Sequence, residues 1–142
     1  MKAGIDYVGN SVVFFCHDGN RNFILSRRSK NSKDEIDRWD PGGGKIDLHE
    51  GVIETLKREI KEEYCTDVLN YEFLGYRDIH RVVEGKRTHW VALDFKVLVD
   101  RSKVKNGEPH KLEDIGWFTL NNLPAPLHSQ FPKFLELYRD RL

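Results

Sequence analysis

The chain has 142 residues, in which 23 Lys and Arg balance 23 Asp and Glu. Because no net charge attracts them, nucleic acid and membrane surfaces are not expected as partners, and any attraction for phosphate must be local. A chain of this length is expected to form one domain over residues 1–142, burying roughly two-thirds of its unfolded surface.

The sequence predicts a reduced intracellular setting. The apolar run nearest the N-terminus, residues 12–16, is much too short for a signal peptide or a membrane span. The two cysteines, Cys16 and Cys65, do not form a metal-binding pattern. We therefore expect a cytoplasmic protein with inert thiols.

Two strands are predicted near the N-terminus. Residues 11–16 and 22–27 are rich in Val, Phe and Ile, and residues 17–20 between them carry a hairpin signal. The second strand runs into Arg28, which could hold a phosphate through forked hydrogen bonds or could simply keep the strand end soluble. Trp39, in the polar loop that follows, is suited to stacking on a base and equally to packing beneath the next segment.

A glycine cluster and a helix come next. Residues 42–44 are all glycine, which predicts backbone that turns tightly or lies close to another group. Residues 51–64 contain no proline and no glycine after the first position. Apolar residues recur there every four positions, at Val52, Leu56 and Ile60, so we predict an amphipathic helix.

Three carboxylates share one face of this helix. Glu59, Glu62 and Glu63 have i, i+3 and i+4 spacing, and the helical rotation places them beside the apolar stripe. Repulsion between such neighbours costs about 0.2–0.5 kcal/mol per pair even in solvent, and Mg²⁺ with its preference for oxygen ligands would remove this cost. Arg58 stands one turn before Glu62 and could orient a carboxylate. The alternative is a solvated Glu/Lys helix, neutralised by Lys57 and Lys61.

The spacing of the whole segment resembles the Nudix box, which reads G-x5-E-x7-R-E-U-x-E-E-x-G-U with U bulky and aliphatic. Six fixed letters and the first U are met, by Gly44, Glu50, Arg58, Glu59, Ile60, Glu62 and Glu63. Cys65 and Thr66 depart from the pattern, because the family has glycine and an aliphatic residue there. A left-handed cap costs a residue other than glycine about 1 kcal/mol or more. The departure therefore concerns the helix exit and not the acidic face.

The resemblance implies a set of site residues. It implies a Mg²⁺ site, in which Mn²⁺ can substitute, built from the Gly44 carbonyl and the carboxylates of Glu59, Glu62 and Glu63. Arg58 would orient Glu59 or Glu62, and Glu50 would steady the glycine segment. The general base would be Glu59 or an acid from a later loop, for which the candidates are Glu108, Glu113 and Asp114 and our choice is Glu113. Arg28 and Trp39 are the substrate-binding residues that we favour.

The remaining elements are predicted from alternation and turn signals. Strands are expected over residues 71–79, 89–99 and 115–120, with a hairpin tip at 84–86. His80 and His89 have no evident partner and are interpreted as structural or surface residues. Ser129 is suited to cap a last helix whose apolar stripe runs from Phe131 to Leu142. Two helices and five or six strands indicate an α/β protein with a mixed sheet, and the resemblance implies the α/β/α sandwich of the Nudix fold.

The resemblance also implies hydrolysis of a phosphoanhydride in a nucleoside diphosphate linked to a further group. The expected substrate is a nucleoside triphosphate, cleaved to a monophosphate and pyrophosphate in a nucleotide-pool sanitising reaction. No proline lies about one helix length past the box, as in ADP-ribose hydrolases, and the glycine segment lacks the lysine common in dinucleoside polyphosphate hydrolases. ADP-ribose or a similar derivative is the second candidate, and a non-catalytic nucleotide-sensing module is the third. Nudix proteins are often dimers, so a homodimer is a further expectation.

Overall fold

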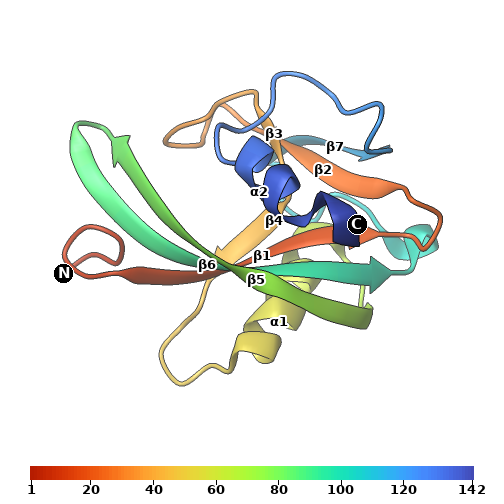
Figure 1. Cartoon of the computed structure of the whole chain (residues 1–142), viewed down its shortest axis with the longest axis horizontal. Helices are drawn as coiled ribbons and strands as arrows, with labels where there is room; N and C mark the ends of the chain where they lie inside the picture. The colour runs from red at the N-terminus through yellow and green to blue at the C-terminus, as the bar shows by residue number, and fades with distance from the viewer.

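Strand β1 (Gly9–His17) lies inside a mixed sheet in the computed structural model, which describes residues 1–142. Figure 1 shows the arrangement of the elements around it. In chain order these are β2 (Phe23–Arg28), β3 (Trp39–Asp40), β4 (Gly42–Lys45), α1 (Val52–Tyr64), β5 (Val68–Val83), β6 (Lys86–Val99), β7 (Leu112–Phe118) and α2 (Phe131–Tyr138). Single 3-10 turns lie at Arg101–Lys103 and Arg139–Arg141.

The sheet opens between β1 and β2. Strand β1 pairs in parallel with β6 from Gly9↔Trp90 to His17↔Leu98 and antiparallel with β4. It pairs with β2 only at His17↔Phe23, after which β2 pairs instead with β7 and β3. The two predicted strands are therefore present, but the predicted hairpin is wrong beyond its first pair. The two strands diverge because each finds a longer partner elsewhere in the sheet.

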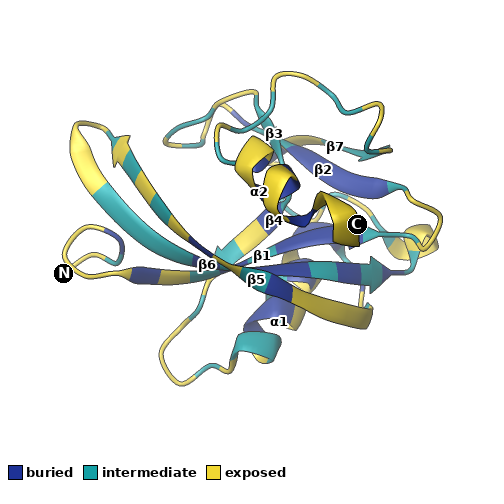
Figure 2. Cartoon of the chain, in the orientation of Figure 1, coloured by how far each residue is buried: buried dark blue, intermediate teal, exposed yellow.

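Alternation along β1 builds a core on each face of the sheet. Val12, Phe14 and Cys16 pack with α1 in one cluster of buried residues, and Phe15 packs with α2 in the other. The helices thus cover opposite faces, as Figure 1 shows, and the buried segments of the strands lie between them in Figure 2. This mixed sheet with a helix on each face confirms the predicted α/β fold.

Strands β5 and β6 form a long curved hairpin whose free end extends beyond α1 and α2 (Figure 1). The hairpin is longer than predicted, because pairing runs from Val68↔Val99 to Val83↔Lys86. Its turn lies at Glu84 and Gly85, where both residues have positive φ, so the predicted tip is correct.

Tyr138 of helix α2 bonds to a buried ion pair between β5 and β6. Arg77 donates to both oxygens of Asp94 at 2.7 and 2.9 Å, and the Tyr138 hydroxyl donates to the same carboxylate at 2.7 Å. The predicted cap at Ser129 is wrong, because Gln130 is the N-cap and makes no side-chain capping bond. Neither α-helix has the length and apolar content that a membrane-spanning helix needs.

Candidate active site

The glycine segment is an extended strand and not a tight turn. In β4, Gly42, Gly43 and Gly44 pair with β1, and none of the three has a positive φ. A Cβ atom on Gly42 would overlap the Phe14 ring, and one on Gly44 would overlap the carboxyl group of Glu59. Glycine is therefore needed at both positions for close approach, the second of the two reasons that the sequence offered.

Helix α1 presents its acidic face along the edge of its buried face. Glu63 is 8% exposed as a residue, and the side chains of Glu59 and Glu62 are 14% and 48% exposed. The solvated-helix alternative therefore does not describe Glu59 or Glu63. The burial follows from the predicted geometry, in which Leu56 and Ile60 of the same helix enter the core.

Arg58 donates hydrogen bonds to three carboxylates of the site. It donates from Nε and Nη2 to the two oxygens of Glu50, at 2.7 and 2.9 Å. Its Nη1 donates to Glu59 at 2.9 Å and to Glu62 at 3.3 Å. Hydrogen bonds from Arg58 and from Thr55 lower the pKa of Glu50 to about 2. Glu50 is thus held as an anion that fixes the guanidinium, which in turn fixes Glu59.

The Glu63 side chain has a buried oxygen atom that makes no hydrogen bond. This atom is Oε2. Burial raises the pKa of Glu63 well above its usual range, and the neighbouring charges of Glu59, Asp40 and Glu108 raise it further. Burial also raises the pKa of Glu59, which Arg58 counteracts. A buried unpaired carboxylate oxygen among other acids is costly.

The donor set fits a hard divalent cation. The side chains offer oxygen atoms only, and the glycine strand β4 lies against Glu59 without an intervening side chain. Oxygen-rich sites of this kind suit Mg²⁺ and Mn²⁺, whereas softer metals prefer imidazole and thiolate. Glu59 and Glu63 supply the more buried carboxylates of this site, and Glu62 and the backbone of Gly44 lie beside Glu59.

Among the loop acids, Glu108 lies nearest this cluster. Its charge raises the pKa of both Glu59 and Glu63, and the adjacent Gly107 N–H donates to the Glu63 carbonyl at 2.9 Å. Glu113 and Asp114 lie instead in β7, with exposed side chains, at the irregular pairing with β2. The structure therefore brings Glu108 to the box residues and leaves Glu113 on the strand beyond.

A second acid, Asp40, was not predicted. It lies in β3 beside the glycines, its side chain is 19% exposed, and burial raises its pKa to about 7 despite the nearby positive charge of Arg28. The one signal for Asp40 in the sequence is its position directly before Pro41 and the glycines. An acid at that position is carried by the same segment of backbone that approaches α1.

Arg28 is already engaged with acidic groups. Its Nη2 donates to Asp34 at 3.1 Å, and its Nη1 lies 3.8 Å from Asp40. Arg81, from the β5–β6 hairpin, pairs with the other oxygen of Asp34. Sequence reasoning missed Asp34 and Arg81, because 47 residues separate them and no local pattern connects them.

Trp39 packs within the protein. Its ring meets the Phe118 ring edge-to-face, with 5.2 Å between centroids, and its backbone bonds to Pro126 and His128. This is the packing role that the sequence left open beside base stacking.

The helix exit shows what the two departures from the box do. Cys65 adopts the left-handed conformation, with φ 59° and ψ 23°, and its N–H donates to the Lys61 carbonyl. Thr66 is fully buried, and its hydroxyl has no hydrogen-bond partner. The backbone therefore keeps the form for which glycine is best suited, and the Thr66 hydroxyl lacks the hydrogen bond that a buried polar group needs.

Comparison with known proteins agrees with this geometry. Residues 8–138 match the model of the NUDIX domain. A MutT NUDIX hydrolase from Burkholderia pseudomallei is 26% identical with a TM-score of 0.81, over 93% of this chain and 98% of that one. The MutT protein from Methanosarcina mazei Go1 is 23% identical with a TM-score of 0.78, over 94% of each chain.

A third structure is the NUDIX domain of Shewanella oneidensis NrtR complexed with ADP ribose. It is 20% identical with a TM-score of 0.71, over 99% of this chain and 90% of that one. The family model covers most of the chain, and the acidic site lies on its box. The chain therefore belongs to the NUDIX family, whose hydrolases use divalent metal ions, and is a hydrolase of phosphorus-containing anhydrides that acts on nucleoside diphosphate derivatives.

Proposed function

We propose that this chain is a Mg²⁺-dependent nucleoside triphosphate pyrophosphohydrolase, which releases a monophosphate and pyrophosphate and removes unwanted nucleotides. The observation that carries the proposal is the buried, unpaired Oε2 of Glu63 within a cluster that also holds Glu59. An enzyme that handles a charged di- or triphosphate needs cations near the substrate, and an unpaired carboxylate oxygen is a ligand suited to them.

In this proposal Glu59, Glu62, Glu63 and the Gly44 carbonyl hold Mg²⁺, for which Mn²⁺ can substitute. When bound, the ion screens the diphosphate and activates a water molecule for attack at phosphorus. Arg58 holds Glu59 in position through its fixed bond to Glu50. A positioned carboxylate then accepts the proton of the attacking water.

The base is assigned to Glu59 first, because it faces the glycine strand and burial raises its pKa. A raised pKa makes a carboxylate a better proton acceptor near neutral pH. Among the loop acids, Glu108 has a charge that raises the pKa of Glu59. Glu113 remains the loop acid that the sequence favoured. Separate Gln variants of Glu59, Glu108 and Glu113 decide between them by their pH–rate profiles.

The substrate end of the proposal rests on the residues that flank the glycines. Arg28 takes a substrate phosphate once it leaves Asp34, and Trp39 remains the aromatic residue that the sequence favours for contact with the base. The absence of ADP-ribose and dinucleoside polyphosphate signatures, together with the likeness to structures named MutT, favours a nucleoside triphosphate. A derivative such as ADP-ribose is the second candidate, supported by the ADP ribose in the complex of the NrtR NUDIX domain.

The test is a product screen with Mg²⁺, Mn²⁺ or no metal, which detects pyrophosphate directly and detects phosphate monoesters, such as AMP and ribose phosphate from ADP-ribose, through added alkaline phosphatase. It covers canonical and oxidised nucleoside triphosphates, ADP-ribose, dinucleoside polyphosphates and nucleotide sugars. Glu62→Gln should lower turnover by orders of magnitude without unfolding the chain, whereas Glu54→Gln, an exposed acid on the same helix, should not. Turnover of ADP-ribose alone would replace the first substrate class by the second.

A non-catalytic nucleotide sensor is the remaining alternative. It predicts that nucleotide and Mg²⁺ raise the melting temperature by mass action while no substrate is consumed. Retention of all three box glutamates argues for turnover. We further propose that residues 1–142 work as one domain in the cytoplasm, without nucleic acid partners, and that light scattering distinguishes a homodimer from a monomer.

A further inference from the structure

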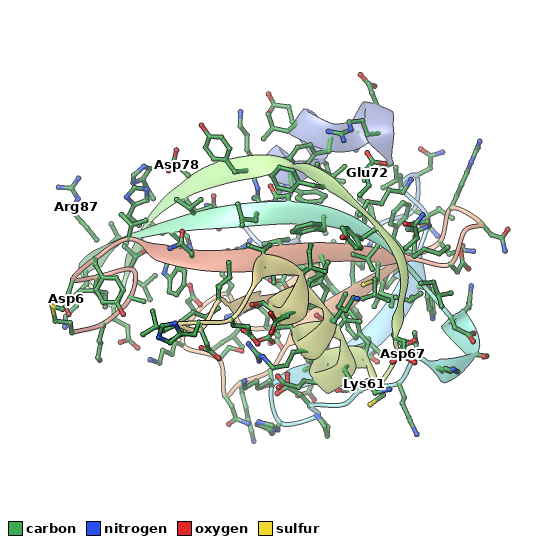
Figure 3. All side chains as sticks on the ribbon, turned by 90° about the horizontal axis from the view of Figure 1, so that it is seen from below. Asp6, Lys61, Asp67, Glu72, Asp78 and Arg87 are labelled. Atoms are coloured by element: carbon green, nitrogen blue, oxygen red, sulfur yellow. The ribbon has the colours of Figure 1, made fainter.

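The free end of the β5–β6 hairpin carries a second group of metal-ligating side chains. Asp78, His80 and His89 each offer a ligand atom, and these atoms all lie within 4.8 Å of one another. Figure 3 shows Asp78 at this end of the hairpin, well away from Lys61 on α1. This group is thus separate from the acidic face of the helix.

The register of the hairpin explains why the three side chains meet. His80 and His89 are directly paired across β5 and β6, so they project from the same face of the sheet. Asp78 lies two residues before His80 on β5 and therefore shares that face. The centroids of the two imidazole rings lie 4.2 Å apart with the rings tilted by 32°, and Asp78 Oδ1 lies 3.0 Å from His89 Nε2. The paired strands hold all three side chains on a common frame.

A cavity of about 340 Å³ adjoins the histidines. His80 and His89 line it together with the N-terminal segment, which includes Asp6. The N-terminal segment is fixed there because the His89 N–H donates to the Gly4 carbonyl at 2.8 Å. The two histidines are therefore open to solvent, and both the Asp6 carboxylate and the Arg87 guanidinium line the cavity.

We propose that Asp78, His80 and His89 bind a transition-metal ion of the Zn²⁺ type, distinct from the ions that the acids of α1 hold. Two imidazoles and one carboxylate suit Zn²⁺, Ni²⁺ or Cu²⁺, whereas Mg²⁺ requires oxygen ligands. The chain thus offers a hard site on α1 and a softer one on the hairpin. The ring of His80 makes no hydrogen bond to another group, so both of its nitrogens are free for an ion.

The alternative is a simple surface pair, in which Asp78 accepts a hydrogen bond from His89 and His80 only stacks. That arrangement accounts for two of the three residues. It leaves His80 without a partner, although its ring lies 4.2 Å from that of His89. An ion bound by one atom from each side chain would join all three residues.

An ion here would fix the strand end that also carries Arg81. Arg81 follows His80 on β5 and therefore projects from the opposite face, where it pairs with Asp34. The proposed metal site and the substrate side of the sheet are thus two faces of the same strand segment. The ion would act as a clamp on the hairpin and take no part in the hydrolysis.

Calorimetric titration of the full chain with ZnCl₂ tests the proposal. The Glu62→Gln/Glu63→Gln background removes ligands of the α1 site, so that Zn²⁺ binding to those acids cannot be mistaken for the hairpin site. We expect one Zn²⁺ per chain in this background. His80→Ala and His89→Ala should each raise the Kd by more than about tenfold, since even outer-layer changes at metal sites cost about 10–100-fold. His110→Ala, which removes an exposed histidine elsewhere, should leave the Kd unchanged.

Histidine side-chain NMR locates the ion directly. The ring signals of both His80 and His89 should move with Zn²⁺ and not with Mg²⁺, and Asp78→Asn should weaken binding while leaving the hairpin folded. Unmoved ring signals, or Zn²⁺ affinity that is equal in the wild-type chain and in His80→Ala, would overturn the proposal. Hydrolysis is read separately, so its failure leaves the result on the hairpin unaffected.

Discussion

The carboxyl group of Glu59 occupies the space that a Cβ atom on Gly44 would fill. Strand β4 and helix α1 are thereby fitted to one another without a side chain between them. The Glu59 carboxyl group therefore lies directly against the backbone of β4. The glycine is therefore a requirement of the site as much as of the fold.

Gly44→Ala should lower turnover about 100-fold, because displacement of a positioned group by about 1 Å can cost that much. Steady-state kinetics with the preferred nucleotide measures the loss, and a melting curve confirms that the variant is folded. Gly51→Ala is the control, since its Cβ would meet only the flexible end of Glu54. Equal activity of Gly44→Ala and the wild type would contradict the role given to this contact.

Arg58→Lys should lower turnover by about 10- to 100-fold, the usual effect of losing a residue that orients a metal ligand. A lysine ammonium cannot make the forked bond to Glu50 and reach Glu59 at the same time. The affinity for Mg²⁺, measured by titration, should weaken with it. Lys57→Arg, on the exposed side of the helix, should leave both quantities unchanged.

Cys65→Gly should stabilise the protein by about 0.5–1 kcal/mol. Glycine relieves the cost of the left-handed conformation, about 1–2 kcal/mol, and gives back about 0.5–1 kcal/mol in chain entropy. The gain is read as a higher urea midpoint at unchanged slope. A lower midpoint would mean that the half-buried thiol contributes more by packing than its backbone costs.

Thr66→Val should also stabilise, by about 1 kcal/mol, because it removes a buried hydroxyl that has no partner. Thr55→Val is the matched comparison and should destabilise, since the Thr55 hydroxyl donates to Glu50 at 2.7 Å. In chemical denaturation, the unfolding midpoint should therefore rise for Thr66→Val and fall for Thr55→Val. Destabilisation by Thr66→Val would show that the Thr66 hydroxyl is hydrogen-bonded in solution.

Acid should destabilise the fold through His128. Burial lowers the pKa of His128 to about 4, and its Nδ1 accepts a hydrogen bond from the Gln130 N–H at 3.1 Å. An unfolded histidine has a pKa of about 6.5, so the unfolded chain takes up the proton first. The free energy of unfolding should therefore fall as the pH drops from about 6.5 to about 4.

His128→Asn keeps an acceptor for Gln130 and does not titrate in this range. Its loss of stability between these pH values should be shallower than that of the wild type, as urea curves at each pH would show. Parallel pH profiles would assign the acid sensitivity to other groups, such as Glu35, which lies 3.5 Å from His128 Nδ1.

Elements with a strong local pattern could be predicted from the sequence. The period of apolar residues predicted α1 and the side of it that carries Glu59 and Glu63, because helical rotation alone determines both. The strand β4 could not be predicted in this way. Three glycines have no intrinsic preference for a strand, and they become one only because β1 and α1 approach closely there.

The electrostatic surroundings of the site also lay beyond the sequence. Asp40, Glu108 and the box glutamates come from separate elements, and only the closed fold lets their charges act on one another. The engagement of Arg28 depends likewise on Arg81, which the β5–β6 hairpin carries to Asp34. Spacing can identify the residues on one helix face, whereas tertiary packing selects the partners that they meet.

Strands β1 and β2 pair only at His17↔Phe23, so the sheet consists of two leaves that separate beyond this pair. The box acids belong to the leaf of β1 and β4, whereas Arg28 and Trp39 belong to the leaf of β2, β3 and β7. Contacts also connect the two leaves, because Asp40 of β3 acts on Glu63 and Arg81 of the β5–β6 hairpin pairs with Asp34 beside Arg28. A substitution on one leaf therefore also changes the charges that act on the other.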